Sequence, residues 1–223
     1  MHFLKGERFL LLGGAGMVGQ QIAHEIAREL EPDQIIICGL SQREVDEAIG
    51  RFESDFPNVP VIGEVGDVFV RSEWNPPARQ TPLSRAELLG GEEHREALYA
   101  DLFLDLDEAY ARSELVRLIT NHAPGVIIDS INTATAFSYQ DIYAASDLVK
   151  RQFEELEAAY RPGRGEPEGG EPAGLVGSVG EALETVLISQ SVPQLVRHVL
   201  LINRAMRKMK TRLYLKVGTT GTG

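Results

Sequence analysis

The residues with the clearest chemical potential are the glycines that follow the apolar run 9–12. Their spacing is Gly14-x-Gly16-x-x-Gly19 or, read from one residue earlier, Gly13-x-x-Gly16-x-x-Gly19. Glycine permits a sharp turn, a close approach of the backbone to phosphate, and tight packing of a helix on a strand. A helix that starts after such a turn offers free N–H groups and a partial positive charge to an anion. The spacing therefore predicts a diphosphate-binding turn, although glycine that serves packing alone is the alternative. The predicted cofactor contacts are Gly13, Ala15, Gly16, Met17 and Val18.

The stretch after the second apolar run, 34–38, bears on the choice of nucleotide. In a dinucleotide fold this strand usually ends in an acid that binds the ribose hydroxyls. Here the run continues with Gly39, Leu40 and Ser41, and Arg43 follows closely. A hydroxyl and a guanidinium suit a 2′-phosphate, so these residues predict NADP, with NAD as the alternative. Ser41 can also cap the next helix, and Arg43 can equally be a solvated helix residue.

Two further polar turns follow apolar runs. Asp67 and Val68 come directly after the run 59–65, where an acid is well placed to meet adenine; a turn or capping role for Asp67 is the alternative. After the run 126–131, small and hydroxyl residues suit a cofactor that passes over the edge of a sheet, or else a capped loop into a helix. These residues are Asn132, Thr133, Ala134 and Thr135.

Strands and helices must alternate to position these turns. Apolar runs predict buried strands over 8–12, 34–38, 59–65, 126–131 and 211–217. Helical periodicity follows Gly16 and covers 42–56, 114–122, 138–160, 181–191 and 194–209. This alternation predicts an α/β fold, a doubly wound parallel Rossmann sheet with strand order 3-2-1-4-5 and helices on both faces.

The whole chain, 1–223, is predicted to be a single dinucleotide-binding Rossmann domain. Residues 71–106 predict an irregular insertion after the third strand, because prolines crowd 75–82, with a short helix over 92–104. The Gly-, Pro- and Glu-rich stretch 161–176 predicts a flexible surface loop. Because the sequence stops within a glycine-threonine loop, we expect it to be the N-terminal portion of a longer chain.

The bulk composition narrows the function classes. The 223 residues carry a formal net charge of -11, which argues against nucleic acid or an anionic membrane as the main partner. A single cysteine excludes an internal disulfide, and the scattered histidines have no ligand spacing, so we expect no metal site. No apolar run reaches membrane-spanning length and no signal peptide precedes the first strand, so a cytoplasmic location is expected.

In their order along the chain, these motifs resemble the extended short-chain dehydrogenase/reductase family, which includes NAD-dependent epimerases and dehydratases. The resemblance rests on 13–19, 66–68, 132–135 and the strand and loop 213–220; Leu12 departs from it, because the family often has threonine there. It implies hydride transfer between nicotinamide C4 and a carbonyl or carbinol carbon of a small-molecule substrate. It also implies that Asp67 and Val68 contact adenine, and that 132–135 line the ribose and nicotinamide.

The catalytic residues of this family are only partly matched. The resemblance implies that Thr219 or Thr220 polarises the substrate carbonyl. The family then uses a Tyr-x-x-x-Lys pair, in which a tyrosinate transfers the proton and the lysine lowers its pKa and holds the ribose. No tyrosine of this chain has a lysine four positions further on. We therefore expect that pair to lie beyond Gly223 or to be absent.

Three functions remain open. The first is an NAD(P)-dependent oxidoreductase or epimerase of the short-chain dehydrogenase type, which the hydroxyl-rich loop after the fifth strand favours. The second is a saccharopine-dehydrogenase-like reductase, whose glycine turn and second strand look similar. The third is a non-catalytic dinucleotide-binding Rossmann module. The helix 138–160 and those after 177 lie where the family often forms a dimer through packed helices, so we hypothesise a homodimer.

Overall fold

The computed structural model describes residues 4–131, 142–159 and 172–218. A five-stranded sheet has the order β3-β2-β1-β4-β5, and every pairing is parallel. The strands are β1 (Arg8–Leu12), β2 (Gln34–Gly39), β3 (Val61–Val65), β4 (Val126–Asp129) and β5 (Leu213–Lys216). The predicted strand order is confirmed, and the later strands are a few residues shorter than predicted. In register, Leu12 pairs with Asp129 and Asp129 pairs with Lys216, so the carboxyl ends of β1, β4 and β5 lie level.

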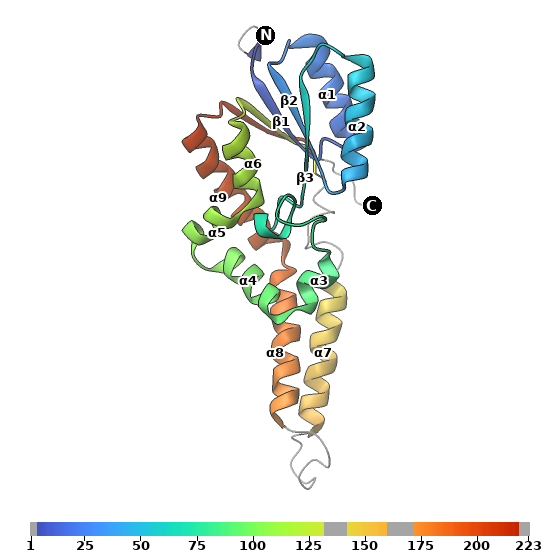
Figure 1. Ribbon diagram of the computed structural model, residues 1–223. Coiled ribbons are helices and arrows are strands. Elements are labelled where there is room, and N and C mark those ends of the chain that lie inside the picture. The colour runs from blue at the N-terminus through green and yellow to red at the C-terminus, as the bar shows by residue number, and fades with distance from the viewer. Residues whose placement is uncertain (1–3, 132–141, 160–171, 219–223) are drawn as a thin grey trace. The chain divides into compact units, whose positions relative to one another are not determined.

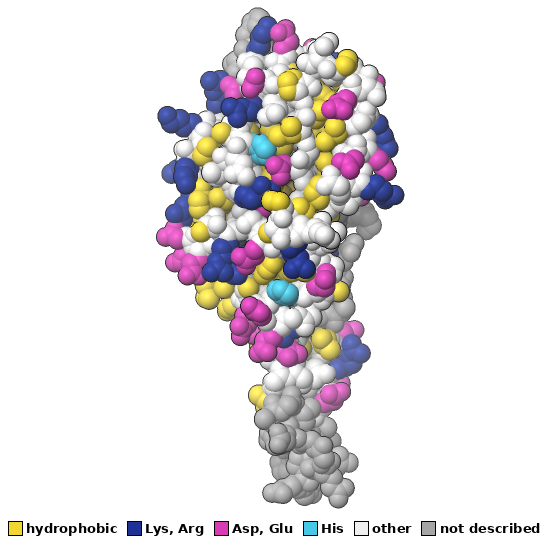
Figure 2. All heavy atoms as spheres, in the orientation of Figure 1, with side chains coloured by type: hydrophobic (Ala, Val, Ile, Leu, Met, Phe, Trp, Pro, Cys, Tyr) yellow, Lys and Arg dark blue, Asp and Glu magenta, His cyan; other side chains and the backbone are white. Residues whose placement is uncertain are grey.

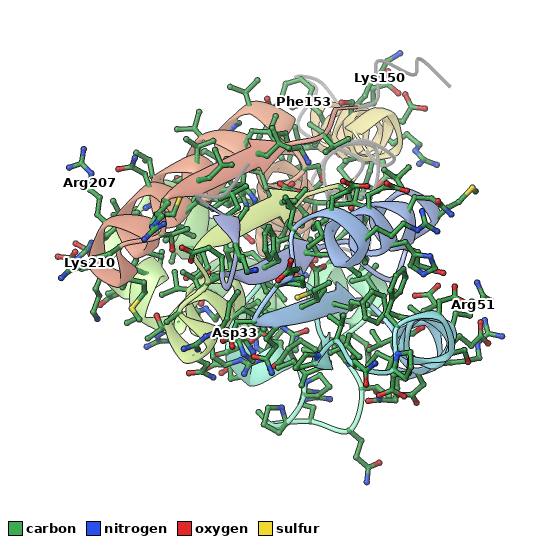
Figure 3. All side chains as sticks on the ribbon, turned by 90° about the horizontal axis from the view of Figure 1, so that it is seen from above. Asp33, Arg51, Lys150, Phe153, Arg207 and Lys210 are labelled. Atoms are coloured by element: carbon green, nitrogen blue, oxygen red, sulfur yellow. The ribbon has the colours of Figure 1, made fainter. Side chains whose placement is uncertain are left out.

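Helices cover both faces of the sheet, as the doubly wound fold requires. They are α1 (Met17–Glu29), α2 (Gln42–Asp55), α5 (Leu106–Arg112), α6 (Glu114–His122) and α9 (Ser191–Met209), with a short 3₁₀ helix Ser72–Trp74. In Figure 1, α1 and α2 lie on one face of the sheet, and α6 and α9 lie on the other. The charged side chains of Arg51 on α2 and Arg207 near the end of α9 extend away from the ribbon (Figure 3).

Two apolar layers form the core because successive strand residues point to opposite faces. Alternate residues of β1 and β2 pack under α1 and α2; this layer includes Phe9, Leu11, Ile35, Ile37, Ala23, Ile26 and Phe52. The other residues of these strands pack under α6 and α9; this layer includes Leu10, Leu12, Ile36, Ile127, Leu115, Ile119 and Ala205. Such continuous apolar strands are typical of a parallel sheet that is buried on both faces.

Contacts within the chain divide it into two compact units, and the sheet belongs to the first, which comprises 1–83, 106–133 and 197–223. The second unit, 84–105 and 134–196, is helical. It contains α3 (Arg85–Gly90), α4 (Glu92–Phe103), α7 (Ile142–Ala159), α8 (Pro172–Ile188) and the first residues of α9. The prediction of one domain over 1–223 stays a prediction.

Within the predicted insertion 71–106, the short helix expected over 92–104 is confirmed as α4, and a further helix, α3, was not predicted. A capping box starts α3: Ser84 Oγ accepts from the Glu87 N–H at 3.3 Å, and Glu87 Oε2 accepts from the Ser84 N–H at 2.8 Å. The predicted loop 161–176 is shorter than expected at its end, because α8 begins at Pro172. Residues 160–171 lie outside the described part of the chain.

Within the second unit, α7 packs along α8 (Figure 1). A buried arginine links α4 to α8. Arg95 Nη1 donates to the Leu89 carbonyl at 2.9 Å, and its other nitrogens lie 3.4 and 3.5 Å from carboxylate oxygens of Glu181 and Glu184. Phe153 on α7 points away from the ribbon (Figure 3). Positive and negative side chains both occur on the face that Figure 2 shows, without a large region of one sign.

No single helix in the described ranges is long and apolar enough to cross a membrane; only the bent pair 176–188 and 192–209 meets the length and composition criteria jointly. Among the same residues, no group of three or more His, Cys, Asp or Glu side chains is arranged to hold a metal ion.

Candidate functional site

The glycine turn joins β1 to α1 in the geometry that an anion site needs. Gly13 has φ +73°, in the left-handed region that favours glycine. The N–H of Gly14 donates to the Leu11 carbonyl at 3.1 Å, and the N–H of Gly16 donates to the Gly13 carbonyl at 3.0 Å. Gly16 is the N-cap residue of α1 and offers no side-chain acceptor. The N–H groups of the first helical residues, 17–19, therefore have no acceptor within their helix and are available to an anion.

Gly19 allows α1 to lie directly on this turn. A Cβ atom at Gly19 would sit 2.5 Å from both the Gly13 carbonyl oxygen and the Gly14 Cα. Real Cβ atoms essentially never approach backbone atoms so closely, so no larger residue fits without moving the turn. The third glycine of the motif is thus required for close packing of helix and turn, as the sequence predicts.

The structure distinguishes the predicted contacts of this turn. The Ala15 N–H donates to the Cys38 carbonyl at 3.2 Å, so it is not free for phosphate. Met17 is 84% exposed at the start of α1, and its backbone N–H, like that of Val18, is free by helix geometry. Of the predicted contacts, the backbone N–H groups of Met17 and Val18 are the ones that this geometry leaves free for an anion.

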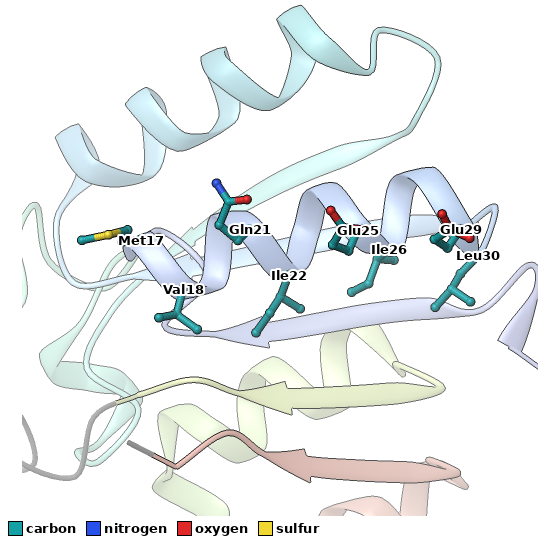
Figure 4. Close-up of a pocket in the computed structure, with 8 residues that line it drawn as sticks. All are labelled: Met17, Val18, Gln21, Ile22, Glu25, Ile26, Glu29 and Leu30. Carbon is teal, nitrogen blue, oxygen red and sulfur yellow. The ribbon is translucent and has the colours of Figure 1, made fainter. Parts of the chain in front are cut away.

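An open apolar groove runs along α1 beyond the turn. Val18, Ile22, Ile26 and Leu30 project from one side of the helix, as Figure 4 shows. Gln21, Glu25 and Glu29 follow its other edge, and Met17 lies at its end. One helix supplies the whole lining, and the polar groups do not converge, so this groove lacks the features of a cofactor site.

The end of β2 is pressed against the glycine turn. A Cβ at Gly39 would lie 2.8 Å from the Ala15 Cβ and 2.8 Å from Val45 Cγ2. The acid that usually stands at this place has no room here. Ser41 caps α2, since its Oγ accepts from the Glu44 N–H at 3.3 Å. Arg43 is exposed in the first turn of α2, so its guanidinium is accessible to a ligand.

Asp67 has a structural role in the turn after β3. Its Oδ1 accepts from the Phe69 N–H at 2.9 Å, and its own N–H donates to Asn75 Oδ1 at 2.7 Å. The buried Asn75 amide also donates to the carbonyls of Asp67, at 3.2 Å, and Arg71, at 3.0 Å. The Val68 side chain packs in the core, so only its backbone can face a ligand. Contact of these two residues with adenine stays a prediction.

A network of charged side chains joins β3 to α6. Arg117 contacts both oxygens of the buried Glu114, at 2.8 and 2.6 Å, and Glu64 Oε2 at 2.9 Å. His122 Nε2 lies 2.7 Å from the other Glu64 oxygen. The hydrogen bond to His122 holds the pKa of Glu64 below its usual range, whereas burial raises the pKa of Glu114. Each carboxylate is engaged by a cation, so we assign this network a structural role.

Cys38 lies beside this network and is chemically inert. Burial, together with the neighbouring Glu64 carboxylate, raises the pKa of its thiol. The thiolate is the reactive form of cysteine, so a raised pKa suppresses reactivity at neutral pH. The sequence interpretation of Cys38 as a small buried hydrophobe agrees with this position.

A second group of charged side chains surrounds Asp129, which ends β4 and is 1% exposed. Its Oδ1 accepts from the Ile131 N–H at 3.0 Å and from Lys216 Nζ at 2.9 Å, and its Oδ2 accepts from the Tyr214 hydroxyl at 2.9 Å. His198 Nε2, from α9, lies 3.6 Å from Oδ2. We call these residues the Asp129 cluster: Asp129, His198, Tyr214 and Lys216.

The ionisation of the Asp129 cluster follows from its contacts. Burial raises the pKa of Asp129, but the His198 imidazole and the Lys216 ammonium outweigh burial, so the net pKa is lowered. Burial and the adjacent carboxylate raise the pKa of Tyr214. Tyr214 therefore stays protonated at neutral pH. Sequence reasoning missed this cluster; its one signal was an acid that interrupts the apolar run 126–131.

The end of β4 is bound to the glycine turn. Ser130 Oγ donates to the carbonyls of Leu12, at 3.0 Å, and Gly13, at 3.3 Å. The residues predicted to line the nicotinamide side, Asn132, Thr133, Ala134 and Thr135, follow this point but lie outside the described residues. The same holds for the predicted carbonyl-polarising residues, Thr219 and Thr220.

No family model matches the sequence, and a comparison with curated proteins finds no match. Several solved structures match this chain, with low sequence identity and low TM-scores. L-sorbose reductase from Gluconobacter frateurii, complexed with NADPH and L-sorbose, is 15% identical to this chain, with a TM-score of 0.34. The match covers 100% of each of the two chains. A short-chain dehydrogenase/reductase from Burkholderia phymatum in complex with NAD is 14% identical, with a TM-score of 0.33, over 97% of this chain and 90% of that one.

Pen from Bacillus thuringiensis is 13% identical with a TM-score of 0.35. The match covers 69% of this chain and 49% of Pen, so the chain spans about half the length of that protein. Similarities this low decide nothing about the activity of the chain. The fold assignment therefore rests on its own strand order, and any function must be argued from its own residues.

Proposed function

We propose that this chain binds a nicotinamide dinucleotide and is an NAD(P)-dependent oxidoreductase or epimerase of the short-chain dehydrogenase type. The observation that carries the proposal is the uncapped N-terminus of α1 directly after the Gly13 turn. Free N–H groups at 17–19 and the positive end of the helix dipole fit a diphosphate. Ligands of open α/β sheets bind outside the carboxyl ends of the strands, at the point where the strand order reverses. In this sheet that point lies between β1 and β4.

The proposed cofactor is NADP. The tight contact of Gly39 with Ala15 leaves no room for the acid that selects the unphosphorylated ribose. Arg43 is exposed just beyond, on the helix that Ser41 caps. A guanidinium binds phosphate through several N–H donors at once, which suits a 2′-phosphate.

Substitution Arg43→Ala is expected to weaken NADPH binding about tenfold or more, the size of one lost charge-assisted hydrogen bond, and to leave NADH binding nearly unchanged. Fluorescence titration with both cofactors measures this. The matched control is Arg51→Ala, because Arg51 lies further along α2 and points away from the ribbon (Figure 3). Wild-type protein that binds NADH more tightly than NADPH would contradict the choice of NADP.

When bound, the cofactor would supply the chemistry of hydride transfer to or from a carbonyl or carbinol carbon of a small-molecule substrate. We propose that Thr219 or Thr220 donates a hydrogen bond to the carbonyl oxygen. The second candidate function is a non-catalytic dinucleotide-binding module. Oxidation of NADPH in the presence of a panel of aldehydes and ketones separates the two: turnover supports the enzyme, and saturable binding without turnover supports the module.

We also propose that the chain forms a homodimer through its long helices. Along α9, the apolar residues Val192, Val196 and Val199 are exposed at helical spacing. Such a stripe is costly to leave in water and fits an interface between copies. Sedimentation equilibrium is expected to give twice the mass of 24.5 kDa, and a monomer at micromolar concentration would remove this part of the proposal.

A further inference from the structure

Lys216 lies at the same edge of the sheet as the glycine turn. It ends β5 in register with Asp129, which ends β4, and Asp129 is in register with Leu12. Its Nζ donates to the Ile131 carbonyl at 2.6 Å, and the Ile131 N–H abuts Gly13, because a Cβ there would lie 3.2 Å from the Ile131 nitrogen. A single residue thus separates the ammonium group from the turn.

The ammonium of Lys216 is held in place, but it has more hydrogen-bond donors than acceptors among the described residues. A lysine ammonium has three N–H donors. Among the described residues, two acceptors engage it, Asp129 Oδ1 and the Ile131 carbonyl. Its side chain is 33% exposed, whereas Asp129 beneath it is buried. Within the described part of the chain the third donor has no acceptor, so it can be offered to a ligand oxygen, and the buried carboxylate holds the cation in place.

The place of Lys216 in the sheet determines which part of a bound dinucleotide it can reach. Ser41 and Arg43 follow β2 and Asp67 follows β3, so the proposed adenosine half lies over that side of the sheet. The two halves of a Rossmann sheet each bind one mononucleotide, and the second half lies on the other side of the switch point. That side is formed by β4 and β5, and Lys216 ends β5.

We propose that Lys216 binds an oxygen in the nicotinamide-side half of the dinucleotide, either on its phosphate or on its ribose. This inference rests on the proposed function. It assigns a ligand contact to a residue on a strand, outside the glycine turn and outside the polar turns that the sequence singles out. Asp129 acts through Lys216 as a positioning residue, because it orients the ammonium without facing the ligand.

The test measures binding of a series of lengthening ligands to the wild type and to Lys216→Met. The series is adenosine 2′,5′-bisphosphate, 2′-phospho-ADP, 2′-phospho-ADP-ribose and NADPH. We expect Lys216→Met to bind the first ligand as tightly as the wild type does. At one of the longer ligands its affinity should fall about tenfold or more below that of the wild type, and this difference should persist for every ligand after it. A loss that begins at 2′-phospho-ADP identifies the phosphate, and a loss that begins at 2′-phospho-ADP-ribose identifies the ribose. Lys216→Arg keeps the charge and should retain most of the affinity.

Three results would overturn the inference: no loss with any ligand, an equal loss with all four, or a loss confined to NADPH. An equal loss would mean that Lys216 serves only as the counter-ion of Asp129. If Lys216→Met does not fold, as judged by circular dichroism, Lys216→Gln provides the same comparison. Wild-type protein that binds neither NADPH nor NADH overturns the proposed function as well, whereas wild-type binding with an unaffected variant overturns this inference alone. If the wild type prefers NADH to NADPH, the same series of ligands without the 2′-phosphate is used instead.

Discussion

Substitution Gly19→Ala is expected to lower the free energy of unfolding by about 3 kcal/mol and to abolish dinucleotide binding. The added Cβ would lie 2.5 Å from the Gly13 carbonyl oxygen and from the Gly14 Cα. Both are backbone atoms of a closed turn, so neither can rotate away as a side chain could. Relief requires α1 to move away from the turn, which displaces the N–H groups that would bind the diphosphate. Urea denaturation and NADPH titration of the same sample measure both effects.

The matched control is Gly50→Ala, also a glycine inside a helix. Gly50 lies in α2, and a Cβ there would meet nothing within 4 Å. Alanine favours a helix over glycine by up to about 1 kcal/mol, so this variant should be as stable as the wild type or slightly more stable. Equal stability of Gly19→Ala and the wild type, with intact NADPH binding, would show that α1 does not depend on this contact.

The second large effect is expected from Asp129→Ala, which should cost about 3–5 kcal/mol of stability at neutral pH. The substitution removes the acceptor of Lys216 Nζ and of the Tyr214 hydroxyl, and it leaves His198 without its nearest carboxylate. His198 is buried, so it loses its compensation in a site that water reaches poorly, and Tyr214 and Lys216 each lose a charged partner. Because these partners come from β5 and α9, we expect the loss to weaken the attachment of both elements to β4.

The pH dependence of this loss has a defined sign. The pKa of Asp129 is lowered in the folded protein, so its contribution is present above its unfolded pKa of about 3.9 and is lost as the pH falls through the folded value. The stability difference between the wild type and Asp129→Ala should therefore shrink on acidification below that unfolded value. Asp33→Ala is the control: this exposed aspartate lies 3.6 Å from Arg8 Nε and should contribute no more than about 1 kcal/mol. A difference that stays constant into acid would contradict the assigned ionisation.

The order of the sheet and the glycine turn could be predicted because their signals are local. Each strand reads as a short apolar run, and the turn, N-cap and start of α1 are contiguous in sequence, from Gly13 to Gly19. Parallel strands and right-handed crossovers then leave few topologies for these elements. The start of α8 at Pro172 was missed because proline has two interpretations. It is favoured in the first turn of a helix, but in a Gly-, Pro- and Glu-rich stretch it also indicates a flexible loop.

The parts that could not be predicted depend on contacts between distant residues. Asp129 contacts Tyr214 and Lys216, which lie more than eighty positions further along the chain. The sequence around these two β5 residues does not indicate that Asp129 is their partner. Asn75 closes the Asp67 turn from a proline-rich stretch that predicts only irregular structure. The missing acid at Gly39 is explained by Ala15, which occupies its space from another turn. Such contacts depend on strand register, which the apolar runs do not specify.

The central claim is that the backbone N–H groups at the start of α1 bind the diphosphate of a dinucleotide. The most direct measurement is a ¹⁵N NMR titration of the protein with NADPH. The account predicts saturable shifts of the amide signals of Gly16, Met17, Val18 and Gly19, and their disappearance in Gly19→Ala. Saturable binding that leaves these amides unchanged and shifts only signals of the groove along α1, such as Ile22 and Glu25, would contradict it.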